Sequence, residues 1–274
     1  MRVCVLAIDG LEYSLVLKWK LKHLMQEYFG RHVSPIDPEH GKPMTPMCWA
    51  SFITGKPPKV HGVRTFTRWG IRFIDKIRFY PPFTWIKGKR RLLMKLGIKP
   101  KPSGIPKNIK TIFDVVKPSI PLFIPSYNEP VELRDKFLHA RKGEFLKKLW
   151  DVHRYRKEVF FRYLRGSEWK LLMCWFDLVD MASHAYINPR HKLVLMRVYL
   201  EANKLAREVR EIVGRDTAVL VASDHGFEKR PDGSFDHSNY GFWSLNVKPP
   251  FRPRRITDFY NLILELVRLS PAPP

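Results

Sequence analysis

Three short, uninterrupted apolar runs stand out along the chain, at residues 3–8, 171–176 and 217–222. Runs of this length without polar alternation are typical of strands buried on both faces of a parallel sheet. The acidic residues that follow these runs within a few positions are Asp9, Asp177, Asp180 and Asp224. Because the carboxyl ends of parallel strands meet at one edge of a sheet, we expect these acids to line a ligand crevice there. Taken one at a time, the acids could equally cap the helices that follow.

Apolar residues spaced three and four apart predict amphipathic helices between these runs. The pattern covers residues 144–165 and 191–213, and residues 112–116 predict a shorter helix. Residues 121–127 then predict a strand whose polar end, at 126–129, either lines the crevice or forms an ordinary turn. Strands that alternate with helices predict an α/β fold with a largely parallel central sheet and helices on both faces.

A further helix is predicted where Thr45 and Pro46 precede an apolar run that Gly55 closes. Threonine at the N-cap, proline in the first turn and glycine just past the end are common helix boundaries. Thr45 is therefore either a simple capping residue or a hydroxyl held in the positive field of a helix N-terminus, where an anion binds. The helix pattern alone leaves both interpretations open.

The composition is that of a full-sized globular protein. With 274 residues, 45% of them hydrophobic, the chain can bury an extensive core, and we expect a single domain over residues 1–274. Three scattered cysteines are too few for a disulfide framework and favour a reducing compartment. No apolar run approaches the roughly 20 residues of a membrane span, and the first run is too short for a signal peptide. These features predict a cytoplasmic protein, and the single glutamine, Gln26, is a weak indication of a thermophile.

Lysine and arginine give the chain a formal net charge of +23, so we expect a polyanion among its partners. More than half of this excess lies in residues 64–110, which hold fourteen basic residues, one acid, and interleaved aromatics and prolines. We interpret this segment as a basic insertion beside the crevice, serving as a cap or a docking segment and partly helical. Within it, a spacing of four would form a basic ridge on a helix. The residues of this ridge are Arg64, Arg68, Arg72 and Lys76.

Three functions for the basic insertion remain open. It could be a solvated surface that carries the excess lysine of a thermophile. It could line a nucleic-acid groove, in which aromatics stack on bases while lysine and arginine follow the phosphates. It could also dock on anionic lipid, which would make the protein peripheral to a membrane.

Histidines close to the acids complete a set of candidate metal ligands. The set consists of Asp9, Asp180, His184, Asp224, His225 and His237. Asp180 and His184 are four residues apart, so they share a face if this segment begins a helix. Any single pair is weak evidence, because a lone histidine is more often an ordinary surface or core residue. Together these residues form a mixed oxygen and nitrogen set suited to two divalent ions such as zinc.

In this order along the chain, these residues and the segment from Thr45 to Gly55, with His61 and Gly62 downstream, resemble the alkaline phosphatase superfamily. Within it, the chain is most similar to the type I phosphodiesterase/nucleotide pyrophosphatase family. The resemblance runs from residue 3 to about residue 247 and implies an alkaline-phosphatase-like three-layer sandwich. It also implies two divalent metal ions, with zinc preferred and manganese or iron as alternatives. One ion would be held by Asp9, Thr45, Asp224 and His225, and the other by Asp180, His184 and His237.

The resemblance further implies that Thr45 is the catalytic nucleophile. A threonine hydroxyl is a poor nucleophile at neutral pH, and coordination to a dication lowers its pKa. Attack on phosphorus would give a phosphothreonine intermediate that water then hydrolyses. Two ions about 3.5–4 Å apart are suited to stabilising the attacking and leaving oxygens of such a displacement.

Two departures from the family pattern concern the contacts to the phosphoryl oxygens. Members of the family usually carry an asparagine three residues after the nucleophile, where this chain has Cys48. Pro46 also lacks the backbone N–H next to the nucleophile. We therefore expect the donors to be the N–H of Met47 or Cys48, or a basic side chain of the insertion. The candidate substrate-binding residues are Cys48, Arg64 and Arg68. The Cys-x-Pro-x-Arg signature of the superfamily's sulfatases is absent around Cys48.

The sequence thus favours a metal-dependent phosphodiesterase or nucleotide pyrophosphatase that acts on an anionic phosphoester. A phosphomonoesterase of the same superfamily is an alternative. So is a protein that binds nucleic acid or a membrane surface and retains a vestigial metal site. The presence of all seven implied ligands argues against such decay.

Overall fold

A six-stranded sheet forms the centre of the computed structural model, which describes residues 1–71, 73–74, 89–98, 101–130 and 143–269. The strand order is β2-β10-β7-β1-β6-β5. The strands are β1 (Arg2–Ile8), β2 (Tyr28–Val33), β5 (Ser119–Leu122), β6 (Leu171–Phe176), β7 (Thr217–Ala222) and β10 (Tyr240–Leu245). Strands β5, β6, β1 and β7 run parallel, and β10 is antiparallel to both β7 and β2. The three apolar runs are therefore confirmed as adjacent, fully buried parallel strands.

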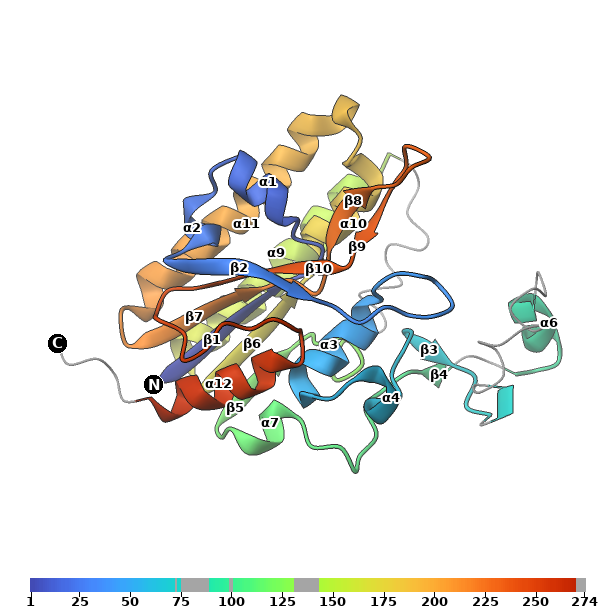
Figure 1. Cartoon of the computed structure of the whole chain (residues 1–274), viewed down its shortest axis with the longest axis horizontal. Coiled ribbons are helices and arrows are strands. Elements are labelled where there is room, and N and C mark those ends of the chain that lie inside the picture. Colours follow the sequence, from blue (N-terminus) through green and yellow to red (C-terminus); the bar gives the residue numbers. More distant parts are fainter. Residues whose placement is uncertain (72, 75–88, 99–100, 131–142, 270–274) are drawn as a thin grey trace.

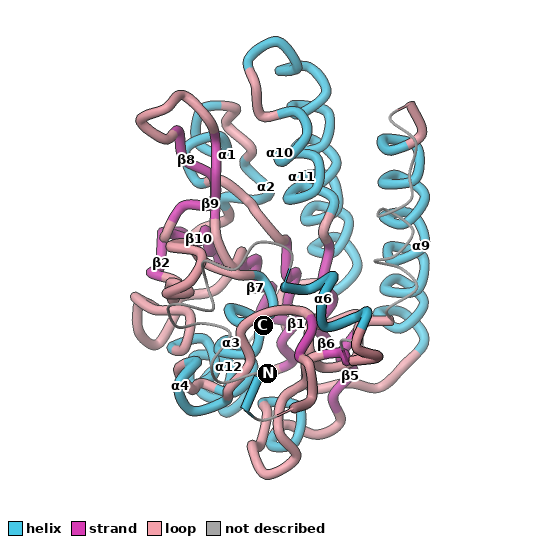
Figure 2. Tube along the Cα trace, turned by 90° about the vertical axis from the view of Figure 1, so that its right-hand side faces the viewer, coloured by secondary structure: helices cyan, strands magenta, loops and turns pink. Residues whose placement is uncertain are grey.

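Helices cover both faces of this sheet, which confirms the predicted three-layer α/β architecture (Figures 1 and 2). On one face lie α9 (Phe145–Gly166), α10 (Leu178–Tyr186) and α11 (Lys192–Val213), and on the other lie α3 (Thr45–Thr54) and α12 (Asp258–Arg268). Helix α9 packs on β6, α11 on β7, and α12 on β1 and α3. The two long helices begin and end within one residue of the boundaries predicted from their apolar spacing.

Smaller elements connect these layers. They are α1 (Tyr13–Lys18), α2 (Lys22–Met25), α4 (Pro58–His61), α7 (Ile112–Val115), the 3-10 helix η2 (Pro189–His191), β8 (Gly226–Lys229) and β9 (Phe235–Ser238). Strands β8 and β9 pair as an antiparallel hairpin that carries His237. Within the basic insertion, β3 (Thr67–Arg68) pairs with β4 (Lys101–Pro102), and α6 (Lys89–Lys95) lies between them in the sequence.

Two local predictions are wrong. The strand expected over 121–127 is β5, which begins at Ser119 and ends at Leu122. The chain turns there because Phe123 has a positive φ of 62° and the Asn128 side chain bonds back to the Ile124 N–H and the Pro121 carbonyl. The predicted helical ridge is also absent among the described residues, because Arg68 lies in strand β3. Arg72 and Lys76 lie outside the described residues.

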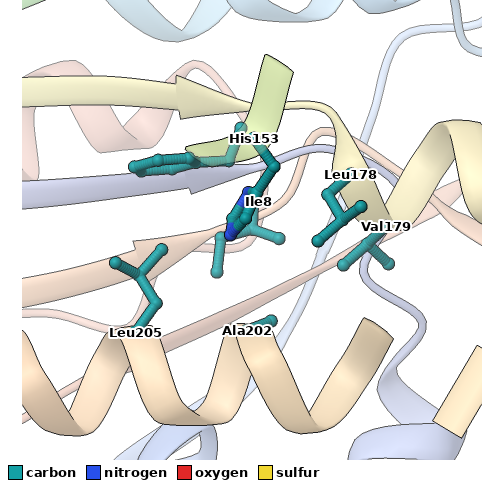
Figure 3. A pocket seen from close by; sticks show the side chains of 7 residues that line it. Ile8, His153, Leu178, Val179, Ala202 and Leu205 are labelled. Carbon is teal, nitrogen blue, oxygen red and sulfur yellow. The ribbon is translucent and has the colours of Figure 1, made fainter. Parts of the chain in front are cut away.

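One hydrophobic core unites the sheet with the helices on both faces. All three cysteines are buried and free, as expected from their scattered positions. A cavity of about 10 Å³ remains between β6, α9, α10 and α11 (Figure 3). It is lined by Ile8, His153, Phe176, Leu178, Val179, Ala202 and Leu205. Its size is near the lower limit for a single water molecule, so it is a packing gap in the core. Among the described helices, none is both long and apolar enough to cross a membrane.

Candidate metal centre

The carboxyl edge of the sheet brings the predicted ligands together. Asp9 directly follows β1, Asp224 and His225 lie two and three residues after the end of β7, and Asp180 lies in the first turn of α10 after β6. Since β1 lies between β6 and β7, the three segments converge at one point. Gly10 permits this approach, because its φ is +68° and a Cβ there would come within 2.7 Å of the Asp180 Cα atom. The acids expected to line a crevice are thus brought together as a cluster of buried side chains.

Two groups of potential ligand atoms share Asp180. In the first, ligand atoms of Asp9, Asp180 and His225 all lie within 4.8 Å of one another, and in the second those of Asp180, His184 and His237 do so. The Nε2 atom of His225 is 3.4 Å from Asp9 Oδ1 and 3.8 Å from Asp180 Oδ1. These separations are too long for hydrogen bonds but are suited to a shared cation. Asp180 therefore belongs to both groups, whereas the family resemblance implied a ligand in one of them.

Several ligand atoms at this edge are buried without a hydrogen-bond partner among the described residues. They are Asp9 Oδ1, Asp180 Oδ1, Asp224 Oδ2 and His225 Nε2. A buried polar atom that forms no hydrogen bond is costly, and four such atoms facing one point call for a cation. Carboxylate oxygens and imidazole nitrogens are also the donors that zinc, manganese and iron accept. The residues present therefore fit a divalent metal.

Hydrogen bonds around the cluster orient the ligand atoms. The Nδ1 atoms of His225 and His237 lie 3.1 Å and 2.9 Å from the backbone carbonyls of Gly226 and Pro43. Donation from Nδ1 leaves the Nε2 lone pairs of both rings facing the centre, as is usual for metal-binding histidine, and His237 Nε2 lies there 2.9 Å from His184 Nε2. The indole N–H of Trp175 donates to Asp9 Oδ2 at 2.9 Å and so leaves Oδ1 as the free ligand atom.

Electrostatics at the cluster reflect burial and crowding of like charges. Burial raises the pKa of Asp9 well above its usual value, and the neighbouring Asp224 and Asp180 carboxylates add to the effect. Burial likewise raises the pKa of Asp224, to about 7. Burial also opposes ionisation of Asp180, but the imidazoles of His184, His225 and His237 beside it lower its pKa to about 2. Such crowded carboxylates are stabilised in the ionised form when a cation lies among them.

The first turn of α3 lies against this cluster. Thr45 is the first residue of the helix and Met44 is its N-cap, so the helix begins one residue earlier than the capping pattern predicted. The Thr45 side chain is buried, and α3 has no side-chain cap hydrogen bond. Two residues earlier, the Pro43 carbonyl meets His237. Burial, followed by the Asp224 and Asp9 carboxylates, raises the pKa of the Cys48 thiol well above its usual value. The Cys48 thiol is thus a neutral group close to the cluster.

The other residues predicted to bind substrate lie elsewhere or are already engaged. The N–H of Cys48 donates to the Met44 carbonyl within the helix, which leaves Met47 as the candidate backbone donor to a phosphoryl oxygen. Arg64 Nε donates to Asp37 Oδ2 at 2.8 Å, and Arg68 is exposed in β3. His61 is buried away from the ligand groups, with its Nε2 atom 2.9 Å from Ser51 Oγ. No structural contact tests the substrate roles of Cys48, Arg64 and Arg68, which stay predictions.

Two basic residues and one tryptophan near the cluster escaped the sequence reasoning. Lys42 pairs with Asp236 at 2.6 Å, next to His237, but it is an isolated lysine with no pattern around it. Arg156 is completely buried on α9, where it pairs with Asp177 at 3.0 Å and lies over the Trp175 ring. A signal for Arg156 was available, because it is four residues from both Val152 and Phe160 on the apolar face of that helix.

Comparison with known proteins gives one family and a common fold. A family model described as type I phosphodiesterase / nucleotide pyrophosphatase matches residues 3–240. Among solved structures, a 2-O GAG sulfatase is similar with a TM-score of 0.59 and 11% identity, over 98% of this chain and 71% of that one. Murine ectonucleotide pyrophosphatase / phosphodiesterase 5 is similar with a TM-score of 0.55 and 11% identity, over 100% of this chain and 96% of that one. An inactive variant of the murine protein in complex with AMP is similar to the same extent. No curated protein sequence gives a significant match. At these identities the structural likenesses show the fold alone.

Proposed function

The chain belongs to the type I phosphodiesterase/nucleotide pyrophosphatase family of the alkaline phosphatase superfamily, and from that premise we propose a metal-dependent hydrolase of phosphodiesters or nucleotide pyrophosphates. The observation that carries the proposal is the set of buried, unpartnered carboxylate and imidazole atoms beside the first turn of α3. A protein that only binds a polyanion has no need to bury such a cluster. One core includes residues from Val3 to Leu266, which supports a single catalytic domain over residues 1–274.

The proposed ligand assignment follows the family pattern. One ion would be held by Asp9, Thr45, Asp224 and His225, and the second by Asp180, His184 and His237. The position of Asp180 between the two groups would let its carboxylate contact both ions. The mixed oxygen and nitrogen donors favour zinc, with manganese or iron as alternatives. When bound, such ions would polarise the phosphoryl group and lower the pKa of a coordinated hydroxyl.

Thr45 would act as the nucleophile. Its oxygen would form a bond to phosphorus while the ester bond to the leaving group breaks, and water would then hydrolyse the phosphothreonine and restore the hydroxyl. The helix position supports this role, because the Thr45 side chain is held in the positive field of the α3 N-terminus and caps no backbone group. The Met47 N–H and the Lys42 side chain are the nearby donors that could contact a phosphoryl oxygen in place of the missing asparagine.

Substitution of the nucleophile tests the proposal. In Thr45→Ala, hydrolysis of bis(p-nitrophenyl) phosphate by the zinc- or manganese-loaded protein should fall on the order of 10³-fold or more. The control is Thr54→Ala on the same helix, where the hydroxyl donates to the Ala50 carbonyl away from the cluster, and it should keep most of the activity. Undiminished hydrolysis in Thr45→Ala, together with no bound divalent metal in the wild type, would refute the proposal.

The same assay separates a diesterase from a monoesterase. The metal cluster alone fits both activities, so the two substrates should share the aryl leaving group and differ only in the second ester. A higher kcat/KM for bis(p-nitrophenyl) phosphate than for p-nitrophenyl phosphate supports the diesterase. The reverse preference assigns the protein to the phosphomonoesterases of the superfamily and leaves the roles of Thr45 and the metal ligands unchanged.

A further inference from the structure

Helix α6 extends from the body of the protein (Figure 1), at the end of the molecule that faces the viewer in Figure 2. Two large apolar side chains of α6, Leu92 at 56% and Met94 at 46%, are exposed to solvent, and so is Leu96, at 66%, which directly follows the helix. None of the three belongs to the hydrophobic core. Leu92 and Leu96 are one helical turn apart and lie on the same face, so they form one continuous apolar surface.

This surface differs from the other exposed apolar residues of the molecule. Leu193 is more exposed, at 81%, but it is a single residue near the start of α11 and such isolated exposure is common in soluble proteins. In α6 and at the residue that follows it, three exposed apolar residues fall within five positions. Ile71 and Phe73, which are also exposed, belong to the same insertion. A concentration of this kind indicates a surface that a partner covers.

The charge around α6 identifies the chemistry of that partner. Residues 64–110 contain fourteen basic residues and one acid. Of the described ones, Lys95 is exposed and lies beside the Leu92 and Leu96 face of the helix, and Arg68 and Lys101 are exposed in the β3–β4 pair at its base. An exposed aliphatic face with lysine and arginine around it matches the boundary of an anionic bilayer, where the acyl region takes the apolar groups and the headgroups take the cations.

Nucleic acid fits this surface less well. Binding to unpaired bases depends on exposed aromatic rings for stacking, and Trp69 is only 8% exposed. Phe73 is an exposed ring that either partner could contact, but the exposed apolar side chains at α6 are aliphatic and gain by leaving water. We therefore propose that the α6 surface, defined by Leu92 and Leu96, docks the protein on anionic lipid membranes. This inference does not depend on the proposed hydrolase activity.

The test is binding of the full-length protein to lipid vesicles. Wild type should sediment with vesicles of equal phosphatidylcholine and phosphatidylglycerol, and its binding should be at least about tenfold weaker to phosphatidylcholine alone. The double variant Leu92→Gln/Leu96→Gln keeps the charge and the helix propensity, and it should bind anionic vesicles at least about tenfold more weakly than wild type. Leu193→Gln is the matched control and should bind like wild type.

Each result of this test bears on the proposal. Equal binding to charged and neutral vesicles, or wild-type binding by Leu92→Gln/Leu96→Gln, would overturn it. Tighter binding to a single-stranded oligonucleotide, unaffected by the double substitution and with no vesicle binding, would assign the basic insertion to nucleic acid instead. Thr45→Ala should still bind anionic vesicles, so loss of hydrolysis and loss of docking are measured separately. Unfolding temperatures of all variants show whether any loss of binding reflects loss of the fold.

Discussion

The carboxyl edge of the sheet and the basic insertion both concentrate charged residues, but the edge buries most of its charged side chains whereas the insertion exposes them to solvent. At the edge, the acids and the imidazoles of His225 and His237 are buried within a few ångströms of each other, whereas His184 is exposed, and the strands dictate where each one lies. In the insertion, lysine, arginine and aliphatic side chains are exposed around α6. Burial makes the charges at the edge interdependent, so a single substitution there disturbs the fold or the metal site. Exposure makes the charges of the insertion individually replaceable, so their effect is collective and appears on binding.

The effect of burial on the cost of a substitution should be largest at Arg156, a completely buried cation that pairs with Asp177 next to the candidate metal ligands. In Arg156→Met the Asp177 carboxylate stays buried without its guanidinium partner, so the free energy of unfolding should fall by about 3–5 kcal/mol. The control is Arg154→Met on the same helix, where the ion pair with Asp151 is exposed, and it should change stability by less than about 1 kcal/mol. Urea unfolding measures both values. Equal effects would show that burial of Arg156 carries no special weight.

Much of the fold and most of the cluster could be predicted from the sequence because burial leaves a regular pattern. A strand covered on both faces must be apolar throughout, so the three apolar runs indicated the positions of β1, β6 and β7. Because these strands are parallel and adjacent, Asp9 and Asp224 must meet at their carboxyl ends. Gly55 ended α3 as predicted, because the left-handed φ of 65° favours glycine.

The failures occur where one side chain overrides a pattern. The strand expected over 121–127 ends early because the Asn128 amide bonds back to the Ile124 N–H, a contact that no periodicity reveals. The spacing of four in the basic insertion predicted a helix at Arg68, but residues without a buried face have no packing that fixes their secondary structure, and Arg68 is in a strand. Trp175 reads as one more apolar strand residue, although its indole N–H reaches Asp9.

The hydrogen bond from Trp175 to Asp9 tests whether a single contact at the buried carboxyl edge affects metal binding. Trp175→Phe keeps a buried ring but removes the N–H that orients the Asp9 carboxylate, so the affinity of the protein for zinc should fall about 10- to 100-fold. Trp243→Phe is the matched control, because its indole nitrogen is buried in the same sheet with no hydrogen-bond partner among the described residues. Competition with a chelator measures zinc affinity, and thermal unfolding of the metal-free proteins gives the packing cost of each substitution. Similar zinc affinities in the two variants would contradict an orienting role for Trp175.

The smallest expected effect is at His61, which lies where the chain leaves the buried α3 and enters the basic insertion. Its Nε2–H donates to Ser51 Oγ and its Nδ1 accepts from the Val63 N–H, so the neutral ring satisfies both neighbours and a second proton would break the Val63 bond. Burial lowers the pKa of His61 from 6.5 to about 4. Because the unfolded chain takes up this proton first as the pH falls, the stability contributed by His61 is complete above about pH 6.5 and is lost toward pH 4. Between pH 7 and pH 5.5, wild type should therefore lose about 1 kcal/mol more stability than His61→Gln, which has no proton to bind. Urea unfolding at the two pH values measures this difference, and His191→Gln, at an exposed histidine, should follow wild type. Identical pH dependence in wild type and His61→Gln would mean that the boundary of the insertion is as open to water as the insertion itself.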